Sequence, residues 1–290
     1  MSTRTTAPMR TSRTGDCWCR WRAAVLVVGL AAGCAGTPSD VPVDAPASRG
    51  DLNASVWARQ SVVGPASVWR HKTFGDRRPT DYRPVVQAGR AAIQARSVAG
   101  NSTLRTEVAA PPGQTAGRLR FSWFVERLND DADLRDRDID DAVARVILTF
   151  DGDHNARFAP RDHLLSELAR LITGEPLPYA TLMYVWDNRY PVGTVIANPH
   201  SERIRQLVVE SGPARLGQWV DMERDVQADF RSVFGEAPGP LLSVGVMTDA
   251  NNTGATVESW YGPVQLGFVS LAAVVNGRTP PDGAAPQHRA

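Results

Sequence analysis

Cysteine is scarce in this chain: only three of its 290 residues are cysteines, and Cys17 and Cys19 lie within the first twenty positions. A mature chain that begins at Cys34 would contain no second thiol, which excludes a disulfide and a cysteine-based zinc site. Any thiol nucleophile would then have to be Cys34 itself. The folded part must therefore be held together by apolar burial and hydrogen bonding alone.

An apolar run long enough to cross a membrane is also lacking near the N-terminus. The run AAVLVVGLAAG at 23–33 is about half the ~20 residues that a spanning helix needs. Five arginines precede it, and small residues stand directly before Cys34, as in a bacterial lipobox. We expect residues 1–33 to be a lipoprotein signal peptide and Cys34 to be lipidated; a secretory signal cut near the same place is the alternative. Ala35, in place of an aspartate, favours sorting to the outer membrane where the organism has one.

Charge of one sign is not in excess. The chain has 32 Lys and Arg against 31 Asp and Glu, a net charge of +1. Removal of a leader with five arginines and one aspartate changes this to −3. No cluster of basic residues with interleaved aromatics is present, so nucleic acid is not an expected partner. The sequence indicates no particular oligomeric state.

Two segments lack any apolar period. Residues 34–53 are rich in Pro, Ala, Ser and Asp, and we expect a flexible tether there, as a lipid-anchored domain needs. Residues 277–290 have a similar composition, and we expect them to be disordered. The folded domain is therefore predicted to span residues 54–276.

Within that domain the dominant period is two. In GRLRFSWFVE, Leu119, Phe121, Trp123 and Val125 alternate with mostly polar residues, which predicts a half-buried strand. Short strands separated by turn-rich loops, without regular helical crossovers, favour a β-sandwich over a parallel α/β sheet. Further strands are predicted at 143–150, 181–186, 203–210, 241–248 and 263–271.

Two helices interrupt this pattern. DHLLSELARLIT at 162–173 places its leucines on one face, with Asp162 as N-cap and Gly174 as the stop. DVQADFRSVFG at 225–235 places its valines and phenylalanines on one face and ends at Gly235. We expect both helices to pack on the sandwich as lids.

Signatures of common catalytic sites are missing: there is no GxGxxG, P-loop, GxSxG or HExxH. The five histidines are scattered without metal-ligand spacing, so we expect each to be satisfied locally or to face solvent. A glycan hydrolase needs two carboxyl groups about 5–10 Å apart. Glu126, Glu210, Asp140 and Asp187 are candidates, but the sequence places no two of them opposite each other, and we assign no catalytic residue.

One aspartate-rich turn has the start of a calcium loop. In FDGDHN, Asp151, Asp153 and Asn155 lie at alternate positions, which suits a hard cation. The pattern then departs from the loop, because Ala156 stands where glycine is needed and Asp162 where a bidentate glutamate is needed. A solvated turn is the favoured interpretation. Calcium is the alternative, and no other cofactor is expected.

Several aromatic residues are candidates for stacking on sugar rings. Trp186 in YVWDNRY has Asp187 and Asn188 beside it to bind hydroxyl groups, and Trp260 and Tyr261 end a later predicted strand. Burial in the core is the alternative, and it is the usual place of such rings in a sandwich.

The stretch GVMTDANNTGATVESWYGP at 245–263 contains an unusual polar cluster between two predicted strands. Asp249, Asn251, Asn252 and Thr253 are turn formers that bond their own backbone, so a capped turn is the favoured interpretation. Binding of a ligand or cation by their side chains is the alternative.

Five segments together resemble a bacterial family catalogued as domain of unknown function 3047, over most of residues 60–268. They are LRFSWFVE, DDAVARVILTFDG, LMYVWDN, GQWVDMERDVQADFRSVFGE and VGVMTDANNTGATVESWYGPVQL. The resemblance implies a jelly-roll-like β-sandwich, often on an exported protein, and supplies no activity. The family's turn resembles Asp-x-Asp-Asn-Thr and its tyrosine is followed by Gly-Asp. Here Asn251 and Pro263 replace the aspartates, which weakens the case for a cation, and the helix at 162–173 resembles an insertion.

Together these features predict a mostly β, jelly-roll-like antiparallel β-sandwich with two short helices packed on it, carried by an envelope lipoprotein. By analogy of fold, the leading function is non-catalytic binding of an envelope glycan. A carboxylate-dependent glycan hydrolase and a structural envelope protein that binds another protein are the alternatives. An exposed Trp186 in a groove would favour binding, two facing carboxylates an enzyme, and a broad apolar patch a protein partner.

Overall fold

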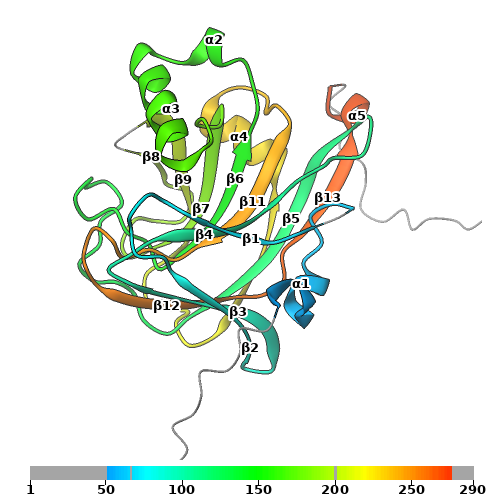
Figure 1. Ribbon diagram of the computed structural model, residues 1–290. Helices are drawn as coiled ribbons and strands as arrows, with labels where there is room; N and C mark the ends of the chain where they lie inside the picture. Colours follow the sequence, from blue (N-terminus) through cyan, green and yellow to red (C-terminus); the bar gives the residue numbers. More distant parts are fainter. Residues whose placement is uncertain (1–50, 66, 199–200, 276–290) are drawn as a thin grey trace, which may run out of the picture. The chain divides into compact units, whose positions relative to one another are not determined.

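The computed structural model describes residues 51–65, 67–198 and 201–275 (Figure 1). The predicted signal peptide, Cys34, the tail at 277–290 and all but the end of the predicted tether lie outside these residues. Within them, no helix is long and apolar enough to span a bilayer. The elements in chain order are η1 Leu52–Ala54, α1 Val56–Gln60, β1 Arg70–Thr73, β2 Asp81–Gln87, β3 Arg90–Val98, β4 Ser102–Glu107, β5 Gln114–Val125, β6 Ala144–Phe150, α2 His154–Arg157, α3 Pro160–Thr173, β7 Ala180–Asp187, β8 Val195–Asn198, β9 Ser201–Ser211, β10 Trp219–Asp225, α4 Val226–Phe234, β11 Leu241–Met247, β12 Thr256–Tyr261, β13 Gln265–Ser270 and α5 Leu271–Val275.

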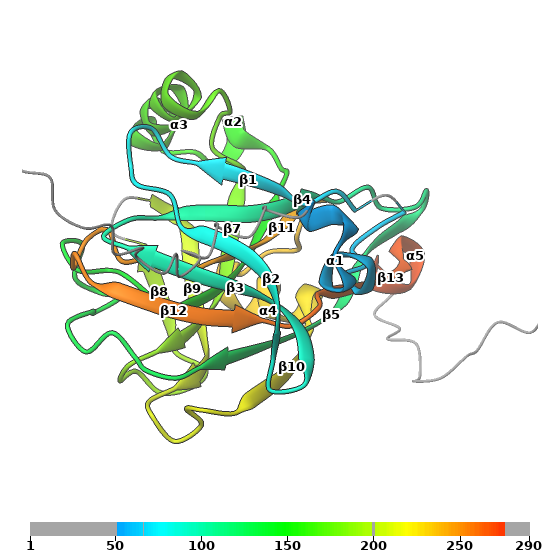
Figure 2. The same ribbon diagram turned by 60° about the horizontal axis from the view of Figure 1, so that its bottom comes forward.

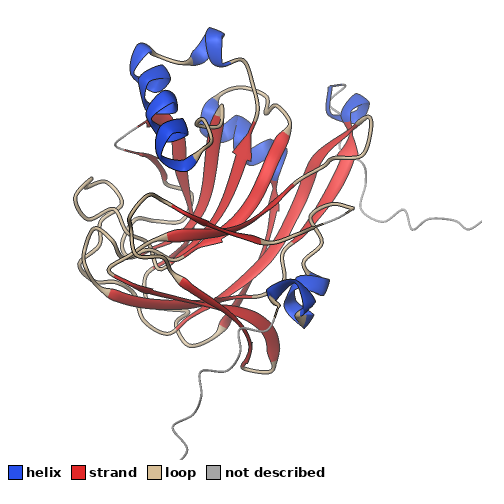
Figure 3. Ribbon diagram, viewed as in Figure 1, coloured by secondary structure: helices blue, strands red, loops and turns tan. Residues whose placement is uncertain are grey.

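The strands of the described residues form two sheets that pack face to face, with short helices at their margins (Figure 3). Sheet A has seven strands in the order β1-β4-β11-β6-β7-β9-β8. Sheet B has the order β10-β5-β12-β3-β2, and β13 pairs with β5 beside β12. The predicted mostly β sandwich is confirmed. Neighbouring strands are antiparallel except β7 and β9, which run parallel.

The core lies between the sheets and follows the alternation in the sequence. Leu119, Phe121, Trp123 and Val125 of β5 are all buried, because alternate side chains of a strand point to one face. Phe121 stacks on Tyr184 of sheet A with ring centroids 5.8 Å apart, which joins the two layers. Burial of each such side chain contributes roughly 1.5–3 kcal/mol, so this strand is a main source of stability.

Helix α4 closes one end of the core as predicted. The Asp225 side chain accepts a hydrogen bond from the Ala228 amide at 3.0 Å and caps the helix. Gly235 ends it in the left-handed conformation, at φ 74°. The buried face carries Phe230, whose ring lies 4.6 Å from that of Phe150 in β6.

Helix α3 packs through the face opposite to the predicted one. Leu164, Leu168 and Leu171 are 71%, 49% and 83% exposed. The helix begins at Pro160, so its N-cap is Ala159 and not Asp162. The Asp162 carboxylate accepts one hydrogen bond from the Ala159 amide at 3.1 Å and another from the Ser201 hydroxyl at 2.8 Å. Polar anchors on one side of the helix therefore fix its orientation and leave the leucines in solvent.

Candidate functional site

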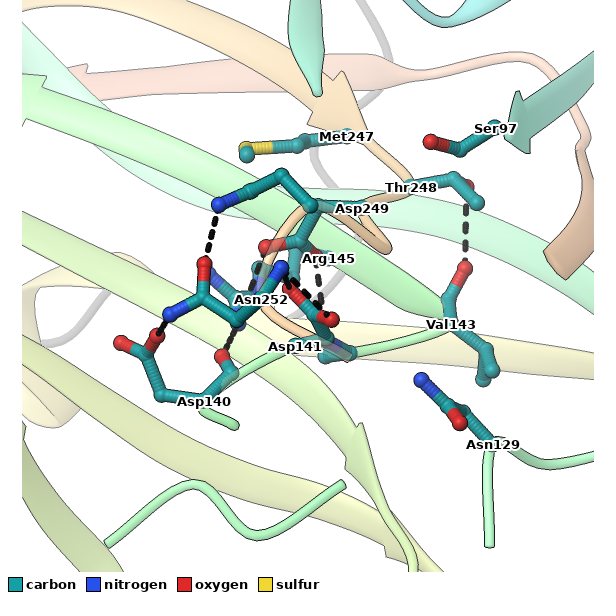
Figure 4. A network of polar contacts seen from close by, with 12 residues as sticks. Ser97, Asn129, Asp140, Asp141, Val143, Arg145, Met247, Thr248, Asp249 and Asn252 are labelled. Atoms are coloured by element: carbon teal, nitrogen blue, oxygen red, sulfur yellow. Dashed lines mark hydrogen bonds and ion pairs between the residues drawn. The ribbon is translucent and has the colours of Figure 1, made fainter. Parts of the chain in front are cut away.

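The turn after β11 is built around two buried carboxylates (Figure 4). Oδ1 of Asp249 accepts a hydrogen bond from the Ala142 amide at 3.0 Å, and its Oδ2 lies 3.4 Å from the Arg145 guanidinium. Both side chains of this ion pair are 5% exposed. Burial raises the pKa of Asp249 to about 7, although Arg145 opposes this, and the neighbouring carboxylate of Asp141 raises it further.

The second carboxylate ties this turn to the loop at 126–143. Asp141 accepts hydrogen bonds from the amides of Asn252 and Thr253 and from the Thr253 hydroxyl, the last two at 2.7 Å. The Asn252 side-chain amide donates to Asp140 at 2.8 Å, and that of Asn251 donates to Asn252. The polar groups of the cluster are therefore committed to one another. These bonds tie the turn to the loop at 126–143, and a turn remains the favoured interpretation of the cluster.

The loop after β7 belongs to the same hydrogen-bond network. Its polar side chains bond to the protein and do not form a surface for a sugar. The Asn188 side-chain amide donates to the Asn129 and Ala132 carbonyls, the second at 3.1 Å, and Asn129 in turn donates to the Thr253 hydroxyl at 3.0 Å. Asp187 accepts hydrogen bonds from two following amides and caps its own turn. The sequence-predicted residues around 187–188 and 249–252 are thus brought together, as parts of a structural network.

The prediction that Trp186 stacks on a sugar ring is wrong. Trp186 is 1% exposed, its ring lies 6.0 Å from that of Trp123, and its Nε1 donates to the Gly212 carbonyl at 3.0 Å. Leu182 and Tyr184, four and two residues earlier on the same strand, share its inward face, so Trp186 belongs to the core.

Trp260 and Tyr261 are also buried and are not binding platforms. Tyr261 points between the sheets, where burial raises its pKa to about 12 and its hydroxyl donates to the Met247 carbonyl at 2.6 Å. Trp260 points to the outer face of sheet B, where it packs edge-on against Phe124 at 5.7 Å. Trp219 of β10 covers Phe124 at 5.6 Å and is itself half-buried, so it is the ring of this outer cluster that reaches the surface.

The aspartate-rich turn after β6 is a helix start. Asp153 caps α2 by accepting a hydrogen bond from the Ala156 amide at 3.0 Å, Asp151 accepts one from the Gly152 amide, and Asn155 is exposed on α2. The described residues contain no group of three His, Cys, Asp or Glu side chains that could hold a metal ion. The geometry supports the solvated turn.

A groove that sequence reasoning missed runs along the outer side of sheet B. A hollow of about 720 Å³ lies between α1 and the β2–β3 hairpin, which Figure 2 shows side by side. A second hollow of about 410 Å³ lies over β5 and β10, and the two meet at Arg90 and Pro263. The first is lined by apolar groups, among them Val85, Ala92 and the 74% exposed Val86.

Charged side chains form the walls of the second hollow. Arg90 makes two hydrogen bonds to Asp221, at 2.6 and 3.2 Å, and its guanidinium lies 5.4 Å from the centre of the Trp219 ring. Glu223 accepts hydrogen bonds from Arg118 and Arg120, which lower the pKa of its carboxyl group. These exposed pairs contribute little to folding, and their side chains are accessible to solvent.

The carboxylates considered for hydrolysis do not converge on this groove. Asp140 and Asp187 are bonded within the loop network, and Glu210 accepts from Arg215 at 3.2 Å. The groove has its own pair, Asp221 and Glu223, two residues apart on one strand face. Strand geometry puts their Cα atoms about 7 Å apart and their side chains on the same side of the sheet. A general acid, however, needs a raised pKa, and that of Glu223 is lowered.

Comparison with known proteins gives a family and no activity. No curated protein matches. Among solved structures, a metagenome-derived glycoside hydrolase family 12 endoglucanase is similar at 11% identity and a TM-score of 0.34, covering 71% of this chain and 99% of its own. The xyloglucanase domain of NopAA, a type three effector from Sinorhizobium fredii in complex with cellobiose, is similar at 8% identity and a TM-score of 0.29, covering 65% and 93%. Similarities this weak say nothing about what this chain binds. The model of the family described as Protein of unknown function (DUF3047) matches residues 67–265, and this chain belongs to that family.

Proposed function

We propose that this protein is a cell-envelope lipoprotein whose β-sandwich binds a glycan chain without cleaving it, in the groove along the outer side of sheet B. The observation that carries this proposal is that the two hollows are neighbours, because both are lined by Arg90 and Pro263. Together they offer a long, open site of the kind that an extended polymer needs, and a small ligand would not use its length.

The chemistry of the groove suits a sugar chain. Apolar side chains such as the half-buried Val85 and the exposed Val86 form surfaces for the CH faces of sugar rings, and the half-buried Trp219 ring packs on the same cluster as Val85. The walls carry Arg90, Asp221 and Gln265, which donate to or accept from hydroxyl groups. This combination of apolar surface and polar rim is what orients a carbohydrate.

Binding is favoured over hydrolysis by the state of the carboxylates in the groove. Hydrogen bonds from Arg120 and Arg118 keep Glu223 ionised, and Asp221 is held by Arg90. Glu223 therefore lacks the raised pKa that the general acid needs for departure of the leaving sugar. Release of reducing ends from any retained polysaccharide would contradict this assignment.

Affinity electrophoresis of residues 35–290 through gels that contain envelope and plant polysaccharides tests the groove. We expect one polymer to retard the protein and Arg90→Ala to weaken binding about tenfold or more, because a hydrogen bond from a charged donor contributes roughly 1.5–3 kcal/mol. Arg83→Ala is the matched control, since Arg83 lies on the same hairpin, is 63% exposed and does not line the groove. Free mobility in every gel, or equal loss in both variants, would overturn the proposal and favour a protein partner.

The lipoprotein part has a separate test on the full chain. We expect labelled palmitate to be incorporated in a bacterial host and the protein to fractionate with membranes, and Cys34→Ala to abolish both. A wild-type chain that is exported and released without label would show that the leader is a simple secretory signal. A variant that keeps its label would place the lipid elsewhere and overturn this part.

A further inference from the structure

A third hollow lies at the edge of sheet A and shares no lining residue with the groove described above. It measures about 250 Å³ and is lined mainly by β1, β4 and Glu175, the second residue after α3. Pockets for drug-sized ligands begin near 300 Å³, so this hollow suits one chemical group and not an extended chain. Its lining is dominated by charged side chains.

Three cations share one face of the two strands that form this hollow. The register places Arg70 directly opposite Arg105 and Lys72 opposite Thr103, and directly opposed residues point to the same side of a sheet. Like charges in such positions repel each other unless an anion lies between them. The side chain of Arg70 is exposed and makes no hydrogen bond or ion pair with the residues that the structure describes. The three cations that β1 and β4 bring to the hollow therefore outnumber the one carboxylate, Glu107, that the same strands bring to it.

One carboxylate from outside the two strands, that of Glu175, forms ion pairs with two of these cations. Both oxygens of Glu175 accept from Arg105 Nη2, at 2.7 and 2.6 Å, and Lys72 Nζ lies 3.1 Å away. Burial would raise the pKa of Glu175, but the hydrogen bonds from Arg105 and Lys72 lower it, so the group is ionised. Glu107 also lines the hollow, on the same strand as Arg105. Glu175 differs from it in coming from a separate segment, directly after the left-handed Gly174 that ends α3.

We propose that this hollow is a binding site for an anionic group, a carboxylate or a phosphate, and that Glu175 occupies it as an internal competitor. An incoming anion takes the hydrogen bonds that Arg105 and Lys72 give to Glu175, and Arg70 supplies the third positive charge. The displaced Glu175 moves into solvent, where its side chain is already 46% exposed. The proposal stands independently of the glycan groove, because the two sites share no residue.

Two sources of such a group are distinguished by the probe. Titration calorimetry of residues 35–290 with inorganic phosphate, with glucuronate and with neutral glucose separates a phosphoryl group from a sugar acid. We expect heat from at least one of the two anions and none from glucose. Stronger binding of glucuronate would point to an acidic polysaccharide, and stronger binding of phosphate to a phosphorylated envelope polymer. Absence of binding by both anions, in the wild type and in Glu175→Gln, would overturn the proposal.

Two substitutions act in opposite directions. Glu175→Gln should tighten anion binding by roughly fivefold or more, because the apparent affinity of a site is reduced by the fraction of time it is unavailable. Arg70→Ala should weaken it, and since the Arg70 side chain makes no hydrogen bond or ion pair with the described residues, the free energy of unfolding should change little. Arg83→Ala, which removes an exposed arginine elsewhere, should leave the affinity unchanged. Equal affinities for the wild type, Glu175→Gln and Arg70→Ala would show that the anion binds at another place.

Discussion

Replacing Asp249 by asparagine removes one titrating group from the protein interior and keeps the size of the side chain. Burial raises the pKa of Asp249 from 3.8 to about 7 against the pull of Arg145, and Asp141 adds to the rise. The folded protein therefore holds a proton on this carboxyl group over a range of pH in which the unfolded chain has already released it.

The sign and size of the effect follow from this difference. Between about pH 4 and pH 7 the folded state binds more protons than the unfolded state, so the contribution of Asp249 to the free energy of unfolding falls as the pH rises. The contribution is absent below the unfolded pKa and is fully destabilising above the folded one. The two pKa values differ by about three, which corresponds to about 4 kcal/mol. With a side chain that is 5% exposed, solvent screens little of this.

Urea unfolding at pH 4, 5, 6, 7 and 8, followed by the fluorescence of the buried Trp123 and Trp186, measures this contribution. The unfolding free energy of Asp249→Asn minus that of the wild type should rise by about 4 kcal/mol from pH 4 to pH 8. This slope is expected even where the variant is less stable at pH 4 because Arg145 has lost its ion pair. Asp130→Asn, at an exposed position, is the control and should show no such slope. A flat difference for Asp249→Asn would refute the reasoning.

Four further substitutions test the fold by the same urea assay. Asp225→Ala removes the cap of α4 and should cost about 1 kcal/mol, and a neutral result would show that the cap is redundant. Gly262→Ala should cost about 1–3 kcal/mol, because its Cβ would lie 2.1 Å from the Ser122 hydroxyl oxygen; wild-type stability would mean that β5 yields there. Leu168→Glu on the exposed face of α3 should change stability by less than about 0.5 kcal/mol, whereas Phe230→Ala in α4 should cost about 3–5 kcal/mol. Comparable losses in these last two variants would show that the leucine face of α3 is covered in solution.

The strands could be predicted from the sequence because their signal is local. Alternation over Leu119, Phe121, Trp123 and Val125 requires only that one face be buried, and a sandwich supplies that face. The same rule could have placed Trp186, since Leu182 and Tyr184 precede it at intervals of two. The prediction that Trp186 binds a sugar depended on the polar residues that follow it, and these residues belong to the turn after the strand.

The orientation of α3 and the groove could not be predicted in this way. A stripe of leucines defines an apolar face of a helix, but it does not say which other element covers that face. Here the orientation of α3 depends on the hydrogen bond from Ser201 of β9 to Asp162, which are far apart in the sequence. The groove likewise joins α1, the β2–β3 hairpin and β10, which meet only through sheet pairing. No window of sequence contains Arg90 and Asp221 together, so their pairing has no local signal.

Because Arg90 lies outside the core, its substitution separates an effect on binding from an effect on stability. The inner faces are filled by the core, and part of the outer face of sheet B is closed by Phe124, Trp219 and Trp260. The exposed Arg90–Asp221 pair lies beyond this cluster, and such pairs contribute about 1 kcal/mol or less to stability. Arg90→Ala should therefore reduce retention by a polysaccharide far more than it reduces the free energy of unfolding. If the free energy of unfolding of this variant instead fell by more than about 2 kcal/mol, the pair would be holding Trp219 in place. The residues of the groove would then have a structural role and not a binding role.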